Sequence, residues 1–211
     1  MLQLHNFSKS YRGRAVLRID SFAFSPGTYW IQGANGSGKS TLLQAIAGVT
    51  PFEGDIRLAG QLSVKKQAVA YRRRVNFAEA EPLFPAFLTG RELIHLFRAA
   101  KGGPLHQEDF YLEGLHMTSY VHEPVGTYSS GMLKKLSLVL AFLGQPTCIV
   151  LDEPLTTLDA AAIPVLCSWM ATQQAQQGTS FLLSSHQAFA AEALPLLQPL
   201  LLEHATLRYP G

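Results

Sequence analysis

The chain of 211 residues is long enough for one sizeable domain with a full hydrophobic core and too short for two large unrelated domains. Apolar residues make up 47% and charged residues 15% of the sequence, a balance that excludes a disordered chain. Lys and Arg number 17 and Asp and Glu 15, and the formal net charge of +2 is too small for sequence-independent binding of nucleic acid. We therefore expect one globular domain without a nucleic-acid partner.

The cysteines and the hydrophobic segments favour a cytoplasmic chain. Cys148 and Cys167 lie in apolar surroundings, which predicts small buried side chains rather than a disulfide or a metal site. No stretch approaches the roughly 18 uninterrupted apolar residues that a membrane-spanning helix needs. Residues 1–11 lack the pattern of a signal peptide.

The first 32 residues show short, strand-like patterns. Leu2 and Leu4 alternate with polar residues, and Phe22 and Phe24 do so before a Pro-Gly pair, so we expect an antiparallel β layer here. Residues 28–32 are β-branched and aromatic and predict a further strand. A glycine-rich turn and the helical spacing of residues 40–48 follow it.

The second half of the chain combines helical and buried-strand patterns. Residues 82–143 are rich in Leu, Phe, His and Met at helical spacing and predict a helical insert. Residues 147–151 and 179–184 are apolar runs without alternation, as in parallel strands buried on both faces, and a helical stretch at 160–175 separates them. Together these segments predict a doubly wound α/β core.

A glycine-rich segment between the strand at 28–32 and the next helix matches the phosphate-loop pattern. It consists of Gly33, Ala34, Asn35, Gly36, Ser37, Gly38, Lys39 and Ser40, with Thr41 following in the helix. Glycines let the backbone N–H groups turn inward towards phosphate oxygens at the positive end of the helix. Lys39 adds a mobile charge, and the Ser40 hydroxyl suits Mg²⁺. The segment therefore predicts a nucleoside triphosphate with Mg²⁺ as ligand; the alternative is a plain glycine-rich turn.

Two adjacent carboxylates, Asp152 and Glu153, follow the buried strand expected at 147–151. Ligand sites of α/β sheets form at this end of the strands. We expect Asp152 to hold the metal through water and Glu153 to reach a water poised to attack the terminal phosphate. Without the phosphate loop, such a pair is more often a turn or a helix cap.

The segment Tyr128-Ser129-Ser130-Gly131-Met132 opens a helix ahead of the acidic pair. This set of motifs, in this order, resembles the nucleotide-binding subunit of ATP-binding cassette (ABC) proteins over essentially the whole chain. The family's signature element reads Leu-Ser-Gly-Gly-Gln and lies across the γ-phosphate held by the opposite subunit. Ser129 and Gly131 match that element, whereas Ser130 and Met132 depart from it. The alternative for Ser129 is an ordinary helix N-cap.

Three further positions agree with the resemblance, and each has a plainer interpretation. Asp159 is similar to the family's D-loop aspartate, which communicates between two ATP sites across the dimer seam, and could instead cap a helix. His186 resembles the switch histidine that contacts the γ-phosphate and the attacking water, although a lone His after a strand is usually only a satisfied polar residue. Tyr11 resembles the aromatic residue on which adenine stacks, and could be a simple strand aromatic.

The family's Q-loop glutamine has no counterpart here. Counting back from Leu83 places Glu79 in that position, and counting forward from Val75 places Ala80 there. A carboxylate at Glu79 suits Mg²⁺, either directly or through water. The basic run at residues 72–74 could meet phosphates or lipid headgroups, but a solvated face is favoured.

The resemblance implies an α/β fold: a P-loop NTPase (RecA-like) core with an N-terminal antiparallel β layer and an inserted α-helical lobe. It further implies that residues 1–211 form a single ABC ATPase domain, with a core lobe of about 1–79 and 146–211 and a helical lobe of about 80–145. A phosphate-loop kinase or GTPase is disfavoured, because it would not need the Ser129 element and no Asn-Lys-x-Asp segment is present.

The implied function is that of the ATP-binding and ATP-hydrolysing subunit of an ABC transporter, with ATP and Mg²⁺ as cofactors. Its partners would be a second nucleotide-binding subunit, identical or paralogous, and an integral membrane permease at the cytoplasmic face of the membrane. The permease would dock near residues 79–97, with Phe84 and Phe87 as exposed apolar candidates. The alternative is a soluble ABC-type ATPase without a membrane partner, for example in iron–sulfur cluster assembly.

Overall fold

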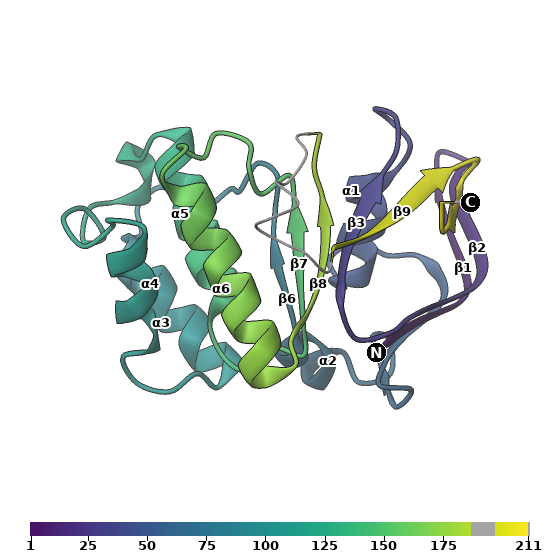
Figure 1. Ribbon diagram of the computed structural model, residues 1–211, viewed down its shortest axis with the longest axis horizontal. Helices are drawn as coiled ribbons and strands as arrows, with labels where there is room; N and C mark the ends of the chain where they lie inside the picture. The colour runs from purple at the N-terminus through teal and green to yellow at the C-terminus, as the bar shows by residue number, and fades with distance from the viewer. Residues whose placement is uncertain (187–196, 211) are drawn as a thin grey trace.

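A six-stranded sheet forms the centre of the protein in the computed structural model, which describes residues 1–186 and 197–210 (Figure 1). The strand order is β10-β9-β3-β8-β7-β6, and all neighbouring pairs are parallel except β10 with β9. The strands are β3 (Thr28–Gln32), β6 (Val75–Ala78), β7 (Cys148–Asp152), β8 (Ser180–Ser184), β9 (Leu197–Glu203) and β10 (Thr206–Arg208). The strands expected near 28–32, 147–151 and 179–184 are therefore confirmed.

Every residue of β7 and β8 is buried, so both faces of the sheet are covered there, which explains the apolar runs without alternation. Ile149 and Leu151 of β7 pack with α5 (Ser130–Phe142) and α6 (Ala162–Gln177). Cys148 and Val150 point to the other face, where they join the cluster of α1 (Lys39–Ile46) and the second sheet. Cys148 and Cys167 are buried and free, as the sequence indicated.

The second sheet is antiparallel, with the order β2-β1-β4-β5, and lies at the right of Figure 1. It contains β1 (Leu2–Tyr11), β2 (Arg14–Phe24), β4 (Glu53–Leu58) and β5 (Leu62–Ser63). The sequence predicts an antiparallel layer within residues 1–32, and the sheet also contains β4 and β5, which follow α1. The pairing of Leu2 with both Phe24 and Leu58 shows how β1 joins the hairpin to this later segment.

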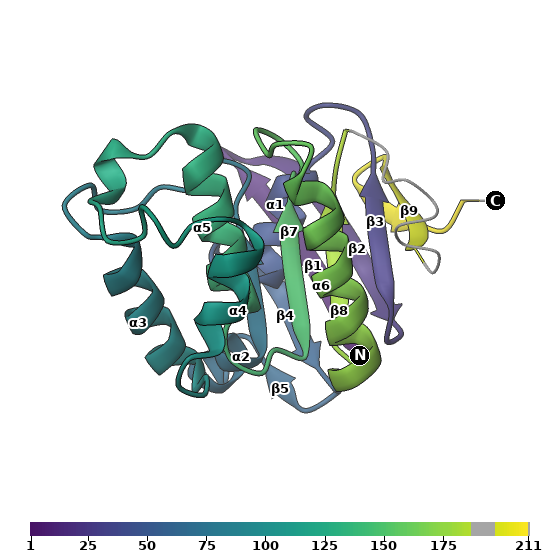
Figure 2. The same cartoon turned by 60° about the vertical axis from the view of Figure 1, so that its left-hand side comes forward.

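Helices gather at the opposite side of the six-stranded sheet (Figures 1 and 2). They include α3 (Gly90–Lys101), α4 (Gln107–Gly114), the 3₁₀ turn η1 (Val125–Thr127) and α5, all within the expected helical insert. The α3 helix begins with a capping box in which Thr89 and Glu92 satisfy each other's backbone N–H groups. The short helix α2 (Ala68–Arg74) precedes β6. No helix in the described part of the chain is long and apolar enough to cross a membrane.

Candidate nucleotide-binding site

The phosphate loop joins β3 to α1 and is curled by its glycines. Gly36 and Gly38 have φ angles of 78° and 102°, in the left-handed region that residues with a side chain avoid. A Cβ atom on Gly33 would lie 2.6 Å from the Leu202 carbonyl oxygen, so only glycine fits beside β9. The buried Lys39 Nζ donates to the carbonyls of Gly33, at 2.8 Å, and Ala34, at 3.2 Å. The loop therefore surrounds a positive charge at a helix N-terminus.

A cavity of about 500 Å³ opens onto this loop. Four separate segments line it: the end of β1 with the start of β2, the phosphate loop with α1, the turn after β7, and the turn after β8. The lining residues are Tyr11, Val16, Asn35, Gly36, Gly38, Lys39, Ser40, Thr41, Glu153 and His186. All of these except Val16 were expected in the site, and the fold brings them to one place from distant positions in the sequence.

The donor set of the cavity fits a nucleoside triphosphate. Lys39 supplies an ammonium group, the glycine-rich turn supplies backbone N–H groups, and α1 directs its positive end towards a bound anion. In the described part of the chain, no three His, Cys, Asp or Glu residues gather to hold a metal by themselves. The Ser40 hydroxyl and the Asp152 carboxylate are hard oxygen donors that suit Mg²⁺ once phosphate oxygens complete its shell.

Asp152 and Glu153 lie at the carboxyl end of β7, and a serine of the next strand holds both. The buried Asp152 accepts a 2.6 Å hydrogen bond at Oδ1 from the Ser184 hydroxyl, which itself accepts one from the Glu153 N–H at 3.1 Å. Glu153 has a φ of 47°, so the chain turns sharply out of the strand. Ser184 was missed from the sequence; its only signal is a hydroxyl at the end of an apolar run.

Glu153 and His186 lie in direct contact. Oε2 of Glu153 accepts a hydrogen bond from the backbone N–H of His186 at 3.1 Å, and Oε1 lies 3.4 Å from His186 Nε2. The side chain of Glu153 is 15% exposed, whereas that of His186 is 55% exposed. The two residues therefore form one polar unit at the rim of the cavity.

Tyr11 ends β1 with its ring half exposed to the cavity. Nζ of Lys9 lies 4.6 Å from the centroid of this ring and also donates to the Pro51 carbonyl at 2.7 Å. The ammonium group is thus fixed beside the ring, which leaves the rest of the aromatic surface for a planar ligand.

Ser129 and Gly131 lie at the N-terminus of α5, outside the lining of the 500 Å³ cavity. Ser129 is the N-cap, and its Oγ accepts from the Met132 N–H at 3.3 Å. A Cβ atom on Gly131 would lie 2.9 Å from the Thr157 carbonyl oxygen. Within one chain, therefore, Ser129 caps a helix and Gly131 allows the segment after β7 to approach that helix.

Asp159 connects the same segment to two helices. Its Oδ1 accepts from the Ala162 N–H at the start of α6, and its Oδ2 lies 2.6 Å from Nζ of Lys135 in α5. The hydrogen bond from Lys135 is the main cause that holds the pKa of Asp159 below its ordinary value. Asp159 is not part of the cavity lining.

Glu79 follows β6 and lines a second cavity of about 450 Å³, between the end of β6, α3 and α5, with Phe84, Leu88 and Leu96. Leu83 of this lining is 90% exposed and Phe84 is half buried. Phe87, which does not line the cavity, is 79% exposed, so of the two phenylalanines expected at the surface only Phe87 is largely exposed. The basic residues Arg72, Arg73 and Arg74 are exposed at the end of α2, consistent with a solvated face.

A second residue missed from the sequence is Lys134, whose side chain is fully buried in α5. Its Nζ donates to the carbonyls of Glu79 and Ala80, each at 2.9 Å, and of Asp152 at 3.3 Å. Burial lowers the pKa of Lys134 to about 8, against the opposing effect of Asp152 and Glu153. Its sequence signal is a lysine within a predominantly apolar helix.

Comparison with known proteins assigns this arrangement to a family. The profile of the ABC transporter family matches residues 17–156. ATP-binding cassette sub-family A member 7 of Mus musculus is 33% identical over 202 residues, which are 92% of this chain and 9% of that protein. The ABC transporter ATP-binding protein YhcH of Bacillus subtilis is 31% identical over 189 residues, 88% of this chain and 62% of that protein. The chain therefore spans only part of the length of these relatives.

Solved structures agree with the sequence comparison. The ATP-binding subunit of an ABC transporter superposes with a TM-score of 0.89 at 26% identity, over 100% of this chain and 89% of that one. A dimeric ATP-binding cassette in a post-hydrolysis state, with ADP and Pi, superposes with a TM-score of 0.77 at 18% identity over both whole chains, which confirms the fold. The profile match, the relatives and the nucleotide cradle together show that this chain belongs to the ABC transporter family of ATP-binding proteins.

Proposed function

We propose that this chain hydrolyses ATP as the motor subunit of an ABC transporter, pairing with a second nucleotide-binding subunit and driving a separate membrane permease. The observation that carries the proposal is the single cavity in which the phosphate loop, Tyr11, Glu153 and His186 meet. An anion-binding helix N-terminus faces a carboxylate there, which is the combination that attack of water on a phosphate requires.

Each group of the cavity has a role in this proposal. Lys39 neutralises the outer phosphates, and the ring of Tyr11 stacks on the base. Glu153 accepts the proton of the attacking water, while His186, 3.4 Å from the Glu153 carboxylate, orients that water and the terminal phosphate. Mg²⁺ bound by Ser40, with Asp152 behind it, would neutralise charge on the phosphate oxygens. Glu79, expected from the sequence as a further oxygen donor, lines the second cavity and not this one.

The N-terminus of α5 would complete the site of a second subunit. Ser129 is exposed, does not line its own chain's cavity, and presents a hydroxyl and a helix N-terminus suited to a phosphate. Gly131 belongs to the same helix start, and Asp159 would lie at the seam between the subunits. The dimeric relative bound to ADP and Pi supports such an assembly.

The membrane partner would dock on the apolar region around the second cavity. Leu83 and Phe87 are large, exposed and close in sequence to Phe84 and Leu88 of the cavity lining. Exposed apolar patches of this kind mark interaction sites. The chain would then sit peripherally on the cytoplasmic face of the membrane, attached through its permease.

The test is the pair Glu153→Gln and Lys39→Ala, assayed for ATP turnover and for equilibrium binding of a fluorescent ATP analogue. Glu153→Gln should lower kcat by about 10²-fold or more, retain nucleotide affinity, and elute as a dimer in gel filtration with ATP. Lys39→Ala should lose nucleotide affinity itself. Parental turnover by Glu153→Gln, or retained affinity in Lys39→Ala, would contradict the proposal.

A further inference from the structure

Lys134 brings a buried positive charge to the point where two strands of the six-stranded sheet end. An ammonium group has three N–H donors and no acceptor. Here the donors meet three backbone carbonyls, those of Glu79 and Ala80 after β6 and that of Asp152 at the end of β7. Burial of a charge is tolerated only where its hydrogen bonds are satisfied in this way.

The contact with Asp152 fixes a particular peptide plane. The Asp152 carbonyl and the Glu153 N–H belong to the same planar peptide group. Lys134 holds the carbonyl edge of this group and Ser184 holds its N–H edge. The group is therefore held from both sides directly before Glu153 turns into its left-handed conformation with a φ of 47°.

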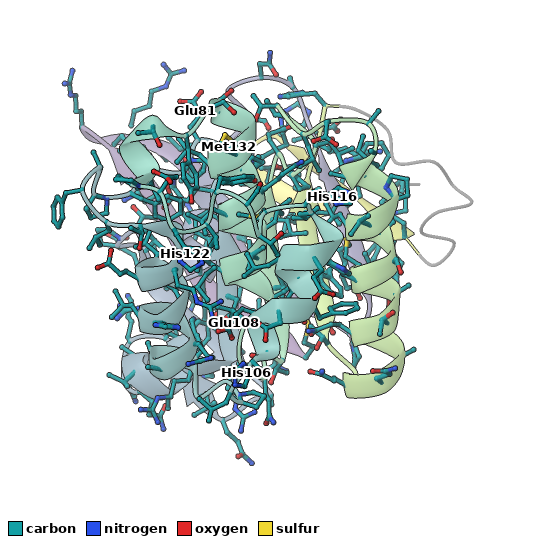
Figure 3. All side chains as sticks on the ribbon, turned by 90° about the vertical axis from the view of Figure 1, so that its left-hand side faces the viewer. Glu81, His106, Glu108, His116, His122 and Met132 are labelled. Carbon is teal, nitrogen blue, oxygen red and sulfur yellow. The ribbon has the colours of Figure 1, made fainter. Side chains whose placement is uncertain are left out.

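Lys134 also lies on the helix that begins at Ser129. A second polar contact fastens the other end of this helix to β6, since Nδ2 of Asn76 donates to the carbonyls of Ala141, at 2.7 Å, and Leu143, at 2.8 Å. Figure 3 shows Met132, at the start of α5, and Glu81, after β6, at the same end of the molecule. The start of α5 is thus tied directly to the ends of β6 and β7.

We propose that Lys134 is a positioning residue for hydrolysis. By holding the Asp152 carbonyl and the segment at residues 79–80, it fixes the position of the Asp152 and Glu153 carboxylates relative to the N-terminus of α5 at Ser129. This inference rests on the ATPase function proposed above. A displacement of about 1 Å at a reacting group lowers rates by about 10²-fold, so small shifts of this peptide matter. Lys134 itself is not among the residues that line the nucleotide cavity.

Lys101 provides a matched control. It is also a lysine whose Nζ donates to backbone carbonyls, those of Arg72 and Val75, but these lie before and at the start of β6, away from the carboxylates. We would compare Lys134→Met with Lys101→Met in thermal unfolding, steady-state ATP turnover and binding of a fluorescent ATP analogue. Both variants should lower the melting temperature. Only Lys134→Met should lower kcat, by about tenfold or more, with KM and nucleotide affinity within twofold of the parent.

A glutamine variant provides the test if Lys134→Met does not fold. The amide N–H groups of Lys134→Gln can still donate to some of the three carbonyls, so its kcat should lie between those of the parent and Lys134→Met. Parental kcat in Lys134→Met, or in Lys134→Gln if only that variant folds, would overturn the inference, as would an equal fall of kcat in Lys101→Met.

Hydrogen exchange separates failure of this inference from failure of the proposed ATPase function. Without nucleotide, a Lys134 variant should exchange faster at residues 79–81 and 152–153, and Lys101→Met faster at residues 72–76. If the parent shows no ATP turnover, the proposed function fails and the exchange pattern still tests the positioning role. Unchanged exchange at residues 152–153 in the Lys134 variant would overturn the inference.

Discussion

The hydroxyl of Ser184 donates a 2.6 Å hydrogen bond to the Asp152 carboxylate across the boundary between two adjacent parallel strands. Both residues are buried at the last position of their strands, where the otherwise apolar runs of β7 and β8 end. Because the same hydroxyl accepts from the Glu153 N–H, it holds the side chain of one carboxylate residue and the backbone of the next. This serine is therefore part of the support of the proposed catalytic pair.

Replacing Ser184 by Ala should affect both stability and turnover. The change leaves the buried Asp152 oxygen and the Glu153 N–H without this partner, which should lower the free energy of unfolding by about 1–3 kcal/mol. It should also lower kcat more than nucleotide affinity, because the phosphate loop is untouched. Urea denaturation and steady-state ATPase assays measure the two effects.

Ser180→Ala is the control for this prediction. Ser180 is a buried serine at the opposite end of the same strand, where its Oγ accepts from the Gly27 N–H at 3.1 Å. Its replacement should destabilise the protein and leave kcat near the parental value. Equal losses of kcat in the two variants would show that Ser184 acts only through global stability.

Gly131→Ala tests the contact between α5 and the segment after β7. The new methyl group would lie 2.9 Å from the Thr157 carbonyl oxygen, so the segment at residues 156–159 must shift. We expect a net loss of about 1 kcal/mol in unfolding free energy, after the better helix propensity of Ala is subtracted. ATP-dependent dimerisation, followed by light scattering, should weaken as well.

Ser130→Ala, at the neighbouring position, is the control. It shows whether any substitution at the start of α5 lowers stability and dimerisation, or only one that displaces the Thr157 carbonyl. Ser130 is exposed and its replacement should change stability by less than about 0.5 kcal/mol. A Gly131→Ala protein as stable and as active as Ser130→Ala would show that the Thr157 carbonyl moves away freely.

Local patterns sufficed to predict much of this structure from the sequence. The phosphate loop has a fixed spacing whose glycines are required by backbone geometry, and Gly36 and Gly38 do adopt left-handed φ angles. The buried strands β7 and β8 were found within one residue because a strand covered on both faces leaves an unbroken apolar run. Ile149 and Leu151 pack into one hydrophobic core, and Cys148 and Val150 pack into the other, on the opposite face of the sheet. Because both faces need apolar side chains, the strand lacks the usual alternation of apolar and polar residues.

The remaining features depend on pairings between distant segments. The strand β4 joins β1 because Leu58 pairs with Leu2, a choice that no local propensity encodes. Lys134 and Ser184 were missed because their partners include backbone groups supplied by other elements, and neither a backbone carbonyl nor a backbone N–H can be located from the sequence. Ser129 caps its own helix, as the structure shows. A serine at a helix start carries the same sequence signal whether it only caps the helix or also meets a phosphate, so the sequence alone could not decide between these roles.

The pKa of Lys101 predicts how stability depends on pH. Burial, with a contribution from the charge of Arg72, lowers this pKa from 10.5 to about 8 in the folded protein. Between these values the unfolded chain binds more protons at Lys101 than the folded chain does, so this residue makes stability rise with pH. Lys101→Met lacks the effect. The unfolding free energy of the parent minus that of the variant should therefore increase by about 1–2 kcal/mol from pH 7.5 to pH 9.5.

Urea denaturation of both proteins at the two pH values checks this prediction, because groups common to both cancel in the difference. A difference that stays constant between pH 7.5 and pH 9.5 would show that Lys101 titrates near its ordinary value in the fold.

Three substitutions of Ser129 separate its capping role from a role towards a second subunit. Ser129→Ala removes the acceptor of the Met132 N–H and should lower the free energy of unfolding by about 1 kcal/mol. Ser129→Asn and Ser129→Asp both retain a capping oxygen, and both should keep stability within about 0.5 kcal/mol of the parent. The two differ in charge alone, with the same size and shape.

If the Ser129 end of α5 meets the γ-phosphate held by another subunit, the carboxylate of Ser129→Asp will repel that phosphate. This variant should then bind ATP like the parent but neither dimerise with ATP nor turn it over, whereas Ser129→Asn should retain part of both activities. Gel filtration with ATP and steady-state turnover distinguish the two outcomes. Parental dimerisation and turnover by Ser129→Asp would mean that this serine only caps α5, because no phosphate could then approach the helix end.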